Sequence, residues 1–253
     1  MLRTDDLRRA GYENESCPVC GHAGREYLQA RGYGIDRCTN CGLVYVRNVP
    51  SDEFLANYYR LFFGSGEQSD QPQGFHKKLK NWWLAKRIRY LAGHRRRVLE
   101  IGYGYGNLLQ ALRKEGVFEI EGIDYSEGTL KQLQSRGFNV SISSVEDKIY
   151  PGGRFDVIIG MHVLEHVQDP NRFISEVHRI LSPGGLIYFQ VPCITHWRAR
   201  LAGKNWKHFT PPGHLWYFGP RTMRLFLSKH GFRVRSAHCL SNRTHLTVVA
   251  EKI

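Results

Sequence analysis

From residue 97 onward, short apolar runs alternate with segments of helical periodicity, and this alternation constrains the fold more than any other feature. A repeated strand–helix order implies a mainly parallel sheet with helices on both faces. No helical segment separates the last two runs, so we expect them to form an antiparallel hairpin at one edge. The sequence therefore predicts an α/β, doubly wound fold with a mainly parallel seven-stranded sheet. The expected strands are 97–102, 119–126, 139–144, 154–167 (running into a turn), 184–192, 232–240 and 244–252, and the expected helices are 107–116, 128–137, 170–181 and 221–231.

A glycine-rich turn follows the first of these strands. Gly102, Gly104 and Gly106 let the chain turn tightly and bring backbone N–H groups against a ligand. The N-terminus of the next helix adds partial positive charge there. The spacing differs from the dinucleotide fingerprint G-x-G-x-x-G, so the turn alone identifies no ligand.

Polar groups at the ends of the next two strands complete a nucleoside pocket. Asp124 ends the second strand, where its carboxylate can accept both ribose hydroxyls. Val145 and Glu146 follow the third strand, where they could flank an adenine ring; alternatively, Glu146 is a solvated loop acid. Carboxyl ends of parallel strands meet at one edge of a sheet, so we expect these groups to lie together.

Four motifs, in order, resemble those of the class I S-adenosylmethionine-dependent methyltransferases, whose fold is Rossmann-like. They are VLEIGYGYGNLL, EGIDYS, FDVIIGMHVLEHVQDP and LSPGGLIYFQVP. The resemblance covers about residues 96–253 and implies S-adenosylmethionine as cofactor. It places the glycines and Met161 near the methionine part, Glu100 near the amine, Asp124 on the ribose, and Tyr125, Val145 and Glu146 around the adenine.

Two C-x-x-C pairs near the N-terminus predict a metal site. Cys17 and Cys20 form the first pair, and Cys38 and Cys41 form the second. Four thiolates suit the tetrahedral preference of Zn²⁺ and leave no open position, so the site is expected to be structural. Iron is the chemical alternative, and four free thiols in a loop is the other interpretation.

The N-terminal segment resembles a zinc ribbon fused to many bacterial methyltransferases of secondary and cell-surface metabolism, and to some ribosomal RNA methyltransferases. The expected organisation is a zinc ribbon at 1–48, a helical linker or lid at 49–95, and the methyltransferase domain at 96–253. Within the linker we expect a helix at 51–63, a polar loop, and a basic amphipathic helix at 75–97. Leu79, Trp82, Trp83, Ile88 and Leu91 would supply the apolar face of the basic helix.

The segment after the fourth strand contains two histidines and an acid. If this turn is helical, His162, Glu165 and His166 share one face and could hold a divalent metal or act as a base. The segment resembles the E-x-x-E-H turn of ubiquinone-pathway O-methyltransferases, where the corresponding side chains can bind a divalent ion. His162 replaces the first acid of that pattern. Alternatively, the turn only caps the next helix and packs.

A long basic and aromatic insertion at 193–222 is expected to cover the methyl acceptor. Its sequence resembles the family's P-x-H-L-x-x-F acceptor segment, and His214 matches the histidine of that pattern. His214 is the first candidate for a catalytic base or acceptor ligand; alternatively, it packs under neighbouring aromatic rings. The cations of the insertion could bind an acceptor phosphate or simply lie in solvent. They are Arg198, Arg200, Lys204 and Lys207.

The formal net charge of +13 favours an anionic partner, although a solvated basic surface would explain it equally well. The leading hypothesis is methylation of a small-molecule or glycan-linked acceptor, expected at a hydroxyl of a sugar, polysaccharide or lipid-linked intermediate. An RNA methyltransferase is the alternative, supported by the ribbon and by the basic helix with Trp82 and Trp83. The intact glycine turn and Asp124 argue against a third class, a binding protein without catalysis.

The sequence contains neither an apolar run long enough to span a membrane nor a secretory signal, so a cytoplasmic protein is expected. Cys193 and Cys239 stand apart from the C-x-x-C pairs in apolar surroundings. In a reducing compartment they are expected to be small buried hydrophobic side chains.

Overall fold

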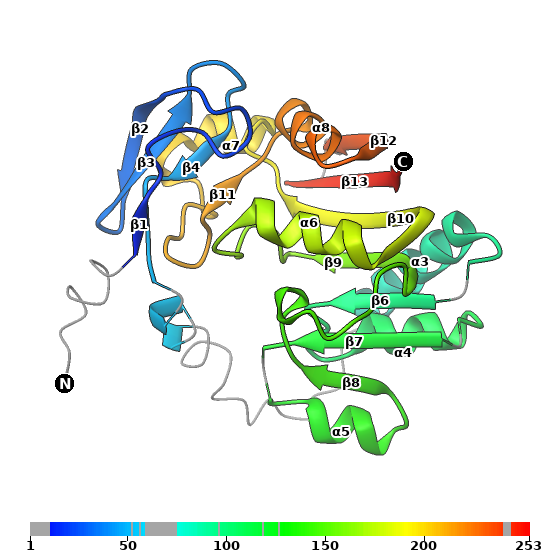
Figure 1. The fold of residues 1–253 in the computed structure, drawn as a ribbon. Coiled ribbons are helices and arrows are strands. Elements are labelled where there is room, and N and C mark those ends of the chain that lie inside the picture. The colour runs from blue at the N-terminus through cyan, green and yellow to red at the C-terminus, as the bar shows by residue number, and fades with distance from the viewer. Residues whose placement is uncertain are drawn as a thin grey trace.

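Figure 1 shows the protein as a computed structural model in which a small β-rich N-terminal lobe lies beside a layered α/β domain. The structure describes residues 11–51, 53–55, 57–58, 75–95, 97–117, 119–125, 127–239 and 244–253. Residues 53–55 and 57–58 are helical, as expected. The remainder of the predicted helix at 51–63, and the polar loop after it, lie outside the described residues.

The α/β domain contains the predicted seven-stranded sheet, in the order β12-β13-β10-β9-β6-β7-β8. Strands β10, β9, β6, β7 and β8 are parallel to one another, while β13 is antiparallel to both β10 and β12. The predicted edge hairpin is therefore confirmed, as is the doubly wound α/β fold. The strands are β6 (Arg97–Ile101), β7 (Glu119–Asp124), β8 (Asn139–Ile142), β9 (Phe155–Met161), β10 (Leu181–Pro192), β12 (Phe232–Cys239) and β13 (His245–Lys252).

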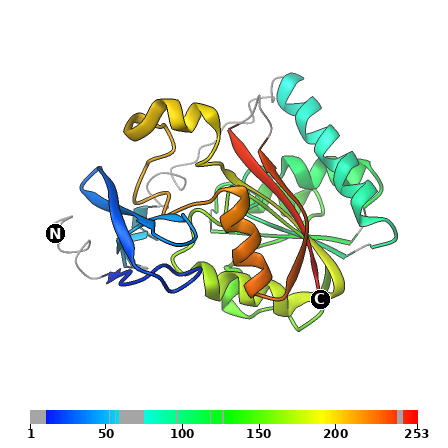
Figure 2. The same cartoon turned by 90° about the horizontal axis from the view of Figure 1, so that it is seen from above.

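Helices cover both faces of this sheet, and successive strand residues point alternately into two separate cores. One core packs β-strand side chains such as Val98 and Ile159 against α3, α4 and α5. The other packs Leu99 and Ile158 against α6 and α8, and it continues into the N-terminal lobe. Seen from above, α3 and α8 lie on opposite sides of the sheet (Figure 2). The helices are α3 (Phe75–Ala92), α4 (Asn107–Lys114), α5 (Leu130–Ser135), α6 (Pro170–Ile180), α7 (Trp197–Ala202) and α8 (Pro220–Lys229), with 3₁₀ turns η1 (Val145–Asp147) and η2 (Gly203–Asn205).

Local chemistry fixes where α6 begins. The Asp169 side chain accepts hydrogen bonds from the backbone N–H groups of Asn171 and Arg172, and Pro170 occupies the first helical position. An acidic N-cap and a proline at this position are both favourable helix starts. The turn between β9 and α6 is therefore held at its end.

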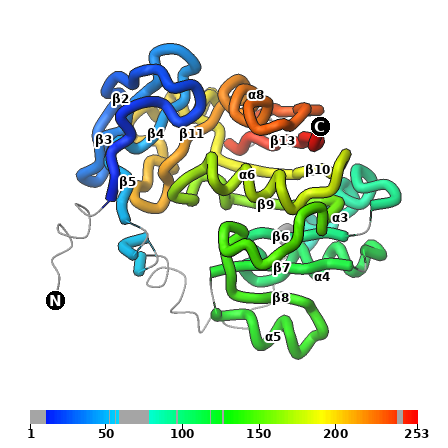
Figure 3. Tube along the Cα trace, viewed as in Figure 1, coloured from blue at the N-terminus to red at the C-terminus, as the bar shows by residue number. Residues whose placement is uncertain are grey.

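The N-terminal lobe contains a four-stranded antiparallel sheet in the order β11-β4-β3-β2. Its outer strand, β11, comes from the insertion at 193–222, because Trp216 and Tyr217 pair with Tyr45 and Val44. Figure 3 traces the chain from β10 through α7 and back to β11 beside β4. The insertion therefore ties the two parts of the molecule together. The strands of this lobe are β1 (Tyr12–Glu13), β2 (Gly24–Ala30), β3 (Tyr33–Cys38), β4 (Val44–Val46), β5 (Asn48–Val49) and β11 (Trp216–Tyr217), with β1 paired to β5.

The basic helix α3 forms, but its apolar face differs from the predicted one. Ile88 is buried and Leu91 packs against the same core half-buried, whereas Leu79 and Trp83 are exposed and Trp82 is half-buried. Alanines at positions 85 and 92 supply the remaining buried contacts, because α3 packs closely on α4. The prediction gave too much weight to large side chains.

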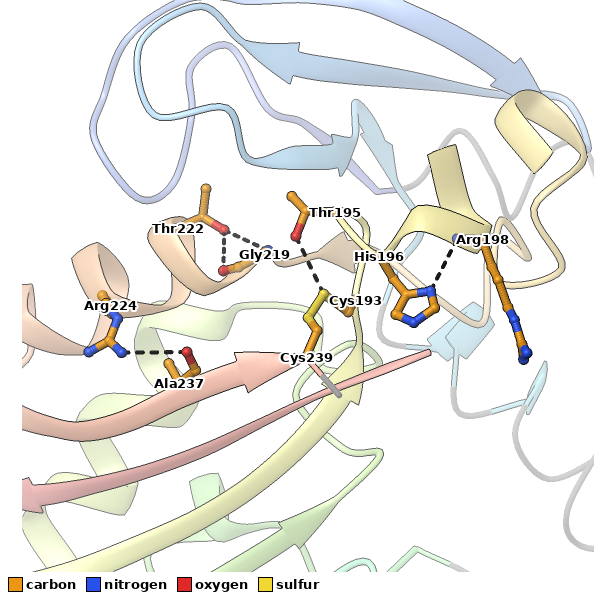
Figure 4. The surroundings of a disulfide bond; sticks show 9 residues. All are labelled: Cys193, Thr195, His196, Arg198, Gly219, Thr222, Arg224, Ala237 and Cys239. Atoms are coloured by element: carbon orange, nitrogen blue, oxygen red, sulfur yellow. Dashed lines mark hydrogen bonds between the residues drawn. A yellow bond between two sulfur atoms is a disulfide. The ribbon is translucent and has the colours of Figure 1, made fainter. Parts of the chain in front are cut away.

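The expectation for the two separate cysteines is also corrected. Cys193, after β10, and Cys239, at the end of β12, form a disulfide across the sheet's outer strands (Figure 4). Their sequence separation of 46 residues gave no indication of the pairing. The β12–β13 hairpin brings them together. Among the described helices, none has the length and apolar character needed to cross a bilayer.

Candidate active site

The glycine turn lies at the carboxyl edge of β6 and is held by a side chain from β7. The backbone N–H of Gly104 donates to Oδ2 of Asp124 at 2.8 Å. The Thr129 hydroxyl donates to the carbonyl oxygen of Gly104 at 2.5 Å. Gly102, Gly104 and Gly106 all have positive φ angles, a conformation that favours glycine. The glycine turn and Asp124, the predicted ribose-binding acid, are therefore in direct contact.

Glu100 lies behind this turn with its side chain only 4% exposed. Its Oε2 has no hydrogen-bond partner within the described part of the chain. Burial, followed by the negative charge of Asp124, raises the pKa of Glu100 well above its ordinary value. A buried carboxyl oxygen without a partner is costly unless a ligand supplies one, and an ammonium group would do so. The structure thus provides an acceptor where the cofactor amine was predicted.

The remaining predicted cofactor residues lie at the ends of adjacent strands. Ser144 caps η1 by accepting a hydrogen bond from the N–H of Glu146. Val145 is buried there, and Glu146 is half-buried. Tyr125, directly after β7, is 64% exposed. Met161 ends β9 and is half-buried. Because the strand order is β9-β6-β7-β8, these groups surround the glycine turn at one sheet edge.

The turn after β9 is not helical, which corrects the geometry assumed for His162, Glu165 and His166. His162 has a φ angle of 60°, and its Nδ1 lies 3.0 Å from Oε1 of Glu165. Glu165 is fully buried, and its Oε2 has no hydrogen-bond partner among the described residues. Burial raises the pKa of Glu165, but the bond to His162 and the neighbouring histidines outweigh it and lower the pKa overall.

His166 and His214 meet across this turn with ring centroids 4.7 Å apart. His166 Nδ1 donates to the carbonyl oxygen of Gly213 at 2.5 Å, and His214 Nδ1 donates to that of His208 at 2.9 Å. Protonation at Nδ1 leaves Nε2 as the basic nitrogen of each ring. Burial, and then the charge of His166, lowers the pKa of His214 to about 4, so its imidazole is neutral at pH 7.

The ligand atoms of Glu165, His166 and His214 all lie within 4.8 Å of one another. The structure therefore groups His214 with Glu165 and His166 of the predicted metal triad. The third member, His162, lies outside this group and orients the Glu165 carboxylate. Two imidazoles and a carboxylate with a vacant lone pair form a donor set that suits a divalent transition metal. The same set could equally serve as an acid–base pair.

Sequence reasoning missed two further histidines of this cluster, His208 and His245. The His245 ring lies 4.7 Å from that of His162, and the His208 ring stacks on His214 at 5.7 Å. Burial, followed by the neighbouring positive charges, lowers the pKa of each to about 4. No motif marks them, because His245 begins β13 and His208 lies in an irregular loop.

The four predicted zinc ligands gather at one point. Cys17, Cys20, Cys38 and Cys41 each offer a sulfur within 4.8 Å of the others. Sγ of Cys17 lies 3.5 Å from that of Cys41, and Sγ of Cys20 lies 3.4 Å from that of Cys38. A closed set of four sulfurs fits a tetrahedral ion held by protein ligands alone.

The cations of the insertion do not line the histidine cluster as a group. Arg198, Arg200, Lys204 and Lys207 are all exposed, and the Arg198 guanidinium lies 5.1 Å from the Trp197 ring. The insertion is anchored at its other end, where Trp216 donates to the carbonyl oxygen of Val167 at 2.7 Å. The insertion thus carries His214 to the β9 turn while its charged side chains face solvent.

Residues 75–237 match the family model described as a methyltransferase domain. The chain belongs to the class I S-adenosylmethionine-dependent methyltransferases. The matched region starts at α3, which packs on α4, so this helix lies within the family's domain.

Among curated proteins, the methyltransferase is 32% identical over 115 residues to the ubiquinone biosynthesis O-methyltransferase of Bordetella avium. The match covers 42% of this chain and 46% of that relative, so the chain spans less than half the length of the relative. Among solved structures, a [4+2]-cyclase aligns with a TM-score of 0.62 at 16% identity, covering 81% of this chain and 97% of the cyclase. An S-adenosylmethionine-dependent methyltransferase from Mesorhizobium loti aligns with a TM-score of 0.56 at 18% identity, covering 68% and 98%. These two likenesses show the fold.

Proposed function

We propose that the protein transfers a methyl group from S-adenosylmethionine to a hydroxyl of a small-molecule or glycan-linked acceptor. The observation that carries the proposal is the pairing of His166 and His214 beside the cofactor edge, with both Nδ1 atoms committed to backbone carbonyls. The name of the Bordetella avium relative supports an oxygen acceptor. A sugar, a polysaccharide end or a lipid-linked intermediate is the acceptor class we favour.

When bound, S-adenosylmethionine supplies a methyl group already activated on a sulfonium. The residues that would hold it are Glu100 at the amine, the turn at Gly104, and Asp124 at the ribose. The fit rests on the orphaned Oε2 of Glu100 and on the hydrogen bond between Gly104 and Asp124. The protein must then hold the acceptor in line with the departing sulfur.

The acceptor hydroxyl loses its proton as its oxygen takes the methyl group, and a nearby base must receive that proton. Nε2 of His214 is suited to this role, because burial keeps the ring neutral at pH 7. The developing imidazolium would be stabilised by the carboxylate of Glu165, which is buried within the same group. His162 would act indirectly by orienting Glu165 through its 3.0 Å bond.

A divalent metal at Glu165, His166 and His214 is a second use of the same residues. The unpartnered Oε2 of Glu165 favours it, because a buried carboxylate oxygen without a donor is costly. Such an ion would polarise the acceptor oxygen and lower the pKa of its hydroxyl. Zinc is proposed separately for the four cysteines, with a structural role.

Transfer of radiolabelled methyl groups to cell extract tests the proposal. The extract is divided into nucleotide-sugar, glycan, lipid and RNA fractions, and each is incubated with the protein and labelled S-adenosylmethionine. Label in a non-RNA fraction that is lost with Asp124→Ala supports the proposal. Label confined to RNA would transfer the assignment to an RNA methyltransferase. The metal alternative is tested separately. Methyl transfer is measured after a chelator has removed divalent ions, and again after zinc has been restored.

A further inference from the structure

An open hollow of about 540 Å³ lies between the cysteine ribbon and the start of α8, and it is lined by three arginines. Arg25 comes from β2, Arg37 from β3, and Arg221 from the first turn of α8. All three side chains are exposed. Nothing in the cofactor edge or the histidine cluster uses this hollow, whose volume suits a small organic ligand.

Two of these arginines form an unusual pair, because Arg25 and Arg37 stand directly opposite each other on antiparallel strands. Like charges at such positions destabilise a sheet. The next register pair, Glu26 and Asp36, places two acids opposite each other, and Glu26 also lines the hollow. There Arg47 offsets their repulsion by donating to Glu26 at 3.3 Å and to Asp36 at 2.9 Å.

The arginine pair has no such counterion among the residues that the structure describes. Within the described part of the chain, neither Arg25, Arg37 nor Arg221 makes an ion pair with an acid. The Arg37 guanidinium instead contacts the Tyr27 ring, 5.3 Å away. In this sheet, Arg47 therefore neutralises the opposed acids, whereas the opposed arginines stay exposed in the hollow.

We infer that this hollow binds a small organic phosphate, whose anionic group bridges Arg25 and Arg37 and also contacts Arg221. Guanidinium groups suit phosphate because each presents two parallel donors to its oxygens. Tyr27, which is 40% exposed in the hollow, offers a ring on which a planar base could stack. The hollow lies beside the acceptor insertion, since the Tyr27 ring meets that of Phe209 with centroids 6.3 Å apart.

Calorimetry on the full chain tests this inference with inorganic pyrophosphate, uridine diphosphate and uridine. We expect both phosphates to bind and uridine to show no binding. Because each charged contact contributes substantially, Arg37→Gln should weaken binding about tenfold or more. Lys131→Gln, on exposed α5, removes the same charge away from the hollow and should leave affinity unchanged.

Arg25→Glu gives the sharper comparison. It converts the opposed arginines into an opposite-charge pair, so phosphate binding should be lost while the thermal midpoint of the free protein rises. A variant that loses binding through misfolding would lower that midpoint instead. The inference does not depend on methyl transfer, and S-adenosylmethionine affinity is measured on the same variants as an independent readout. Binding of pyrophosphate to Arg25→Glu with wild-type affinity, or binding of an RNA oligonucleotide with no response to either phosphate, would overturn it.

Discussion

His166 and His214 meet edge to face at an angle of 75°, although one follows a central strand and the other lies in a distant insertion. If His214 receives the acceptor proton, His214→Gln should lower kcat by roughly 10²–10⁴-fold. The affinity for S-adenosylmethionine should stay the same, because the proposed cofactor residues lie at strand ends and His214 lies in the insertion. His94→Gln, at an exposed position after α3, is the matched control. Wild-type kcat in His214→Gln would exclude His214 as the base.

The contact between Gly104 and Asp124 yields a binding prediction. Asp124→Ala removes both the anchor of the glycine turn and the proposed ribose acceptor. We expect the Kd for S-adenosylmethionine to rise about 100-fold or more, since hydrogen bonds to a charged group are worth about 1.5–3 kcal/mol each. Titration calorimetry measures this, with circular dichroism to confirm folding. An unchanged Kd would remove the cofactor assignment.

Gly106 should tolerate substitution poorly. Its φ angle is +66°, and a Cβ there would overlap the Leu133 side chain. Gly106→Ala should therefore lower the free energy of unfolding by roughly 1–3 kcal/mol. Gly152→Ala is the comparison, because a Cβ at that position would lie 3.5 Å from the nearest atom, the carbonyl oxygen of Arg179. Equal denaturation midpoints for the two variants would contradict the argument from backbone conformation.

The order of strands and helices could be predicted because each element carries its own pattern, as in the alternation from Arg97 to Lys114. The cofactor edge followed from topology, since parallel strands end together. The histidine cluster could not be assembled in this way. His245 reaches it only because β13 inserts between β10 and β12, and His214 only because β11 pairs with β4. Contacts of that kind depend on tertiary arrangement, which leaves no local signal in the sequence.

The low pKa values of His208 and His245 predict acid sensitivity. Each pKa is lowered from 6.5 to about 4 in the folded protein, so the unfolded chain binds more protons between these values. Stability should be complete above about pH 6.5 and should fall as the pH drops towards 4. After allowance for solvent screening, the loss is about 1–2 kcal/mol per histidine. Urea midpoints of wild type and His245→Gln test this, and equal pH slopes would contradict it.

The cysteine cluster and the acceptor insertion should lose order together. Cys38→Ser removes one of four thiolates, and elemental analysis should show zinc falling from about one per chain to near zero. Because Trp216 and Tyr217 pair with β4, which follows the second cysteine pair, amide exchange at these two residues should accelerate. Asn40→Ala changes the same loop without removing a thiolate and should keep the metal. If zinc is lost but exchange at β11 stays slow, the insertion is held by packing around Trp216 instead of by the metal.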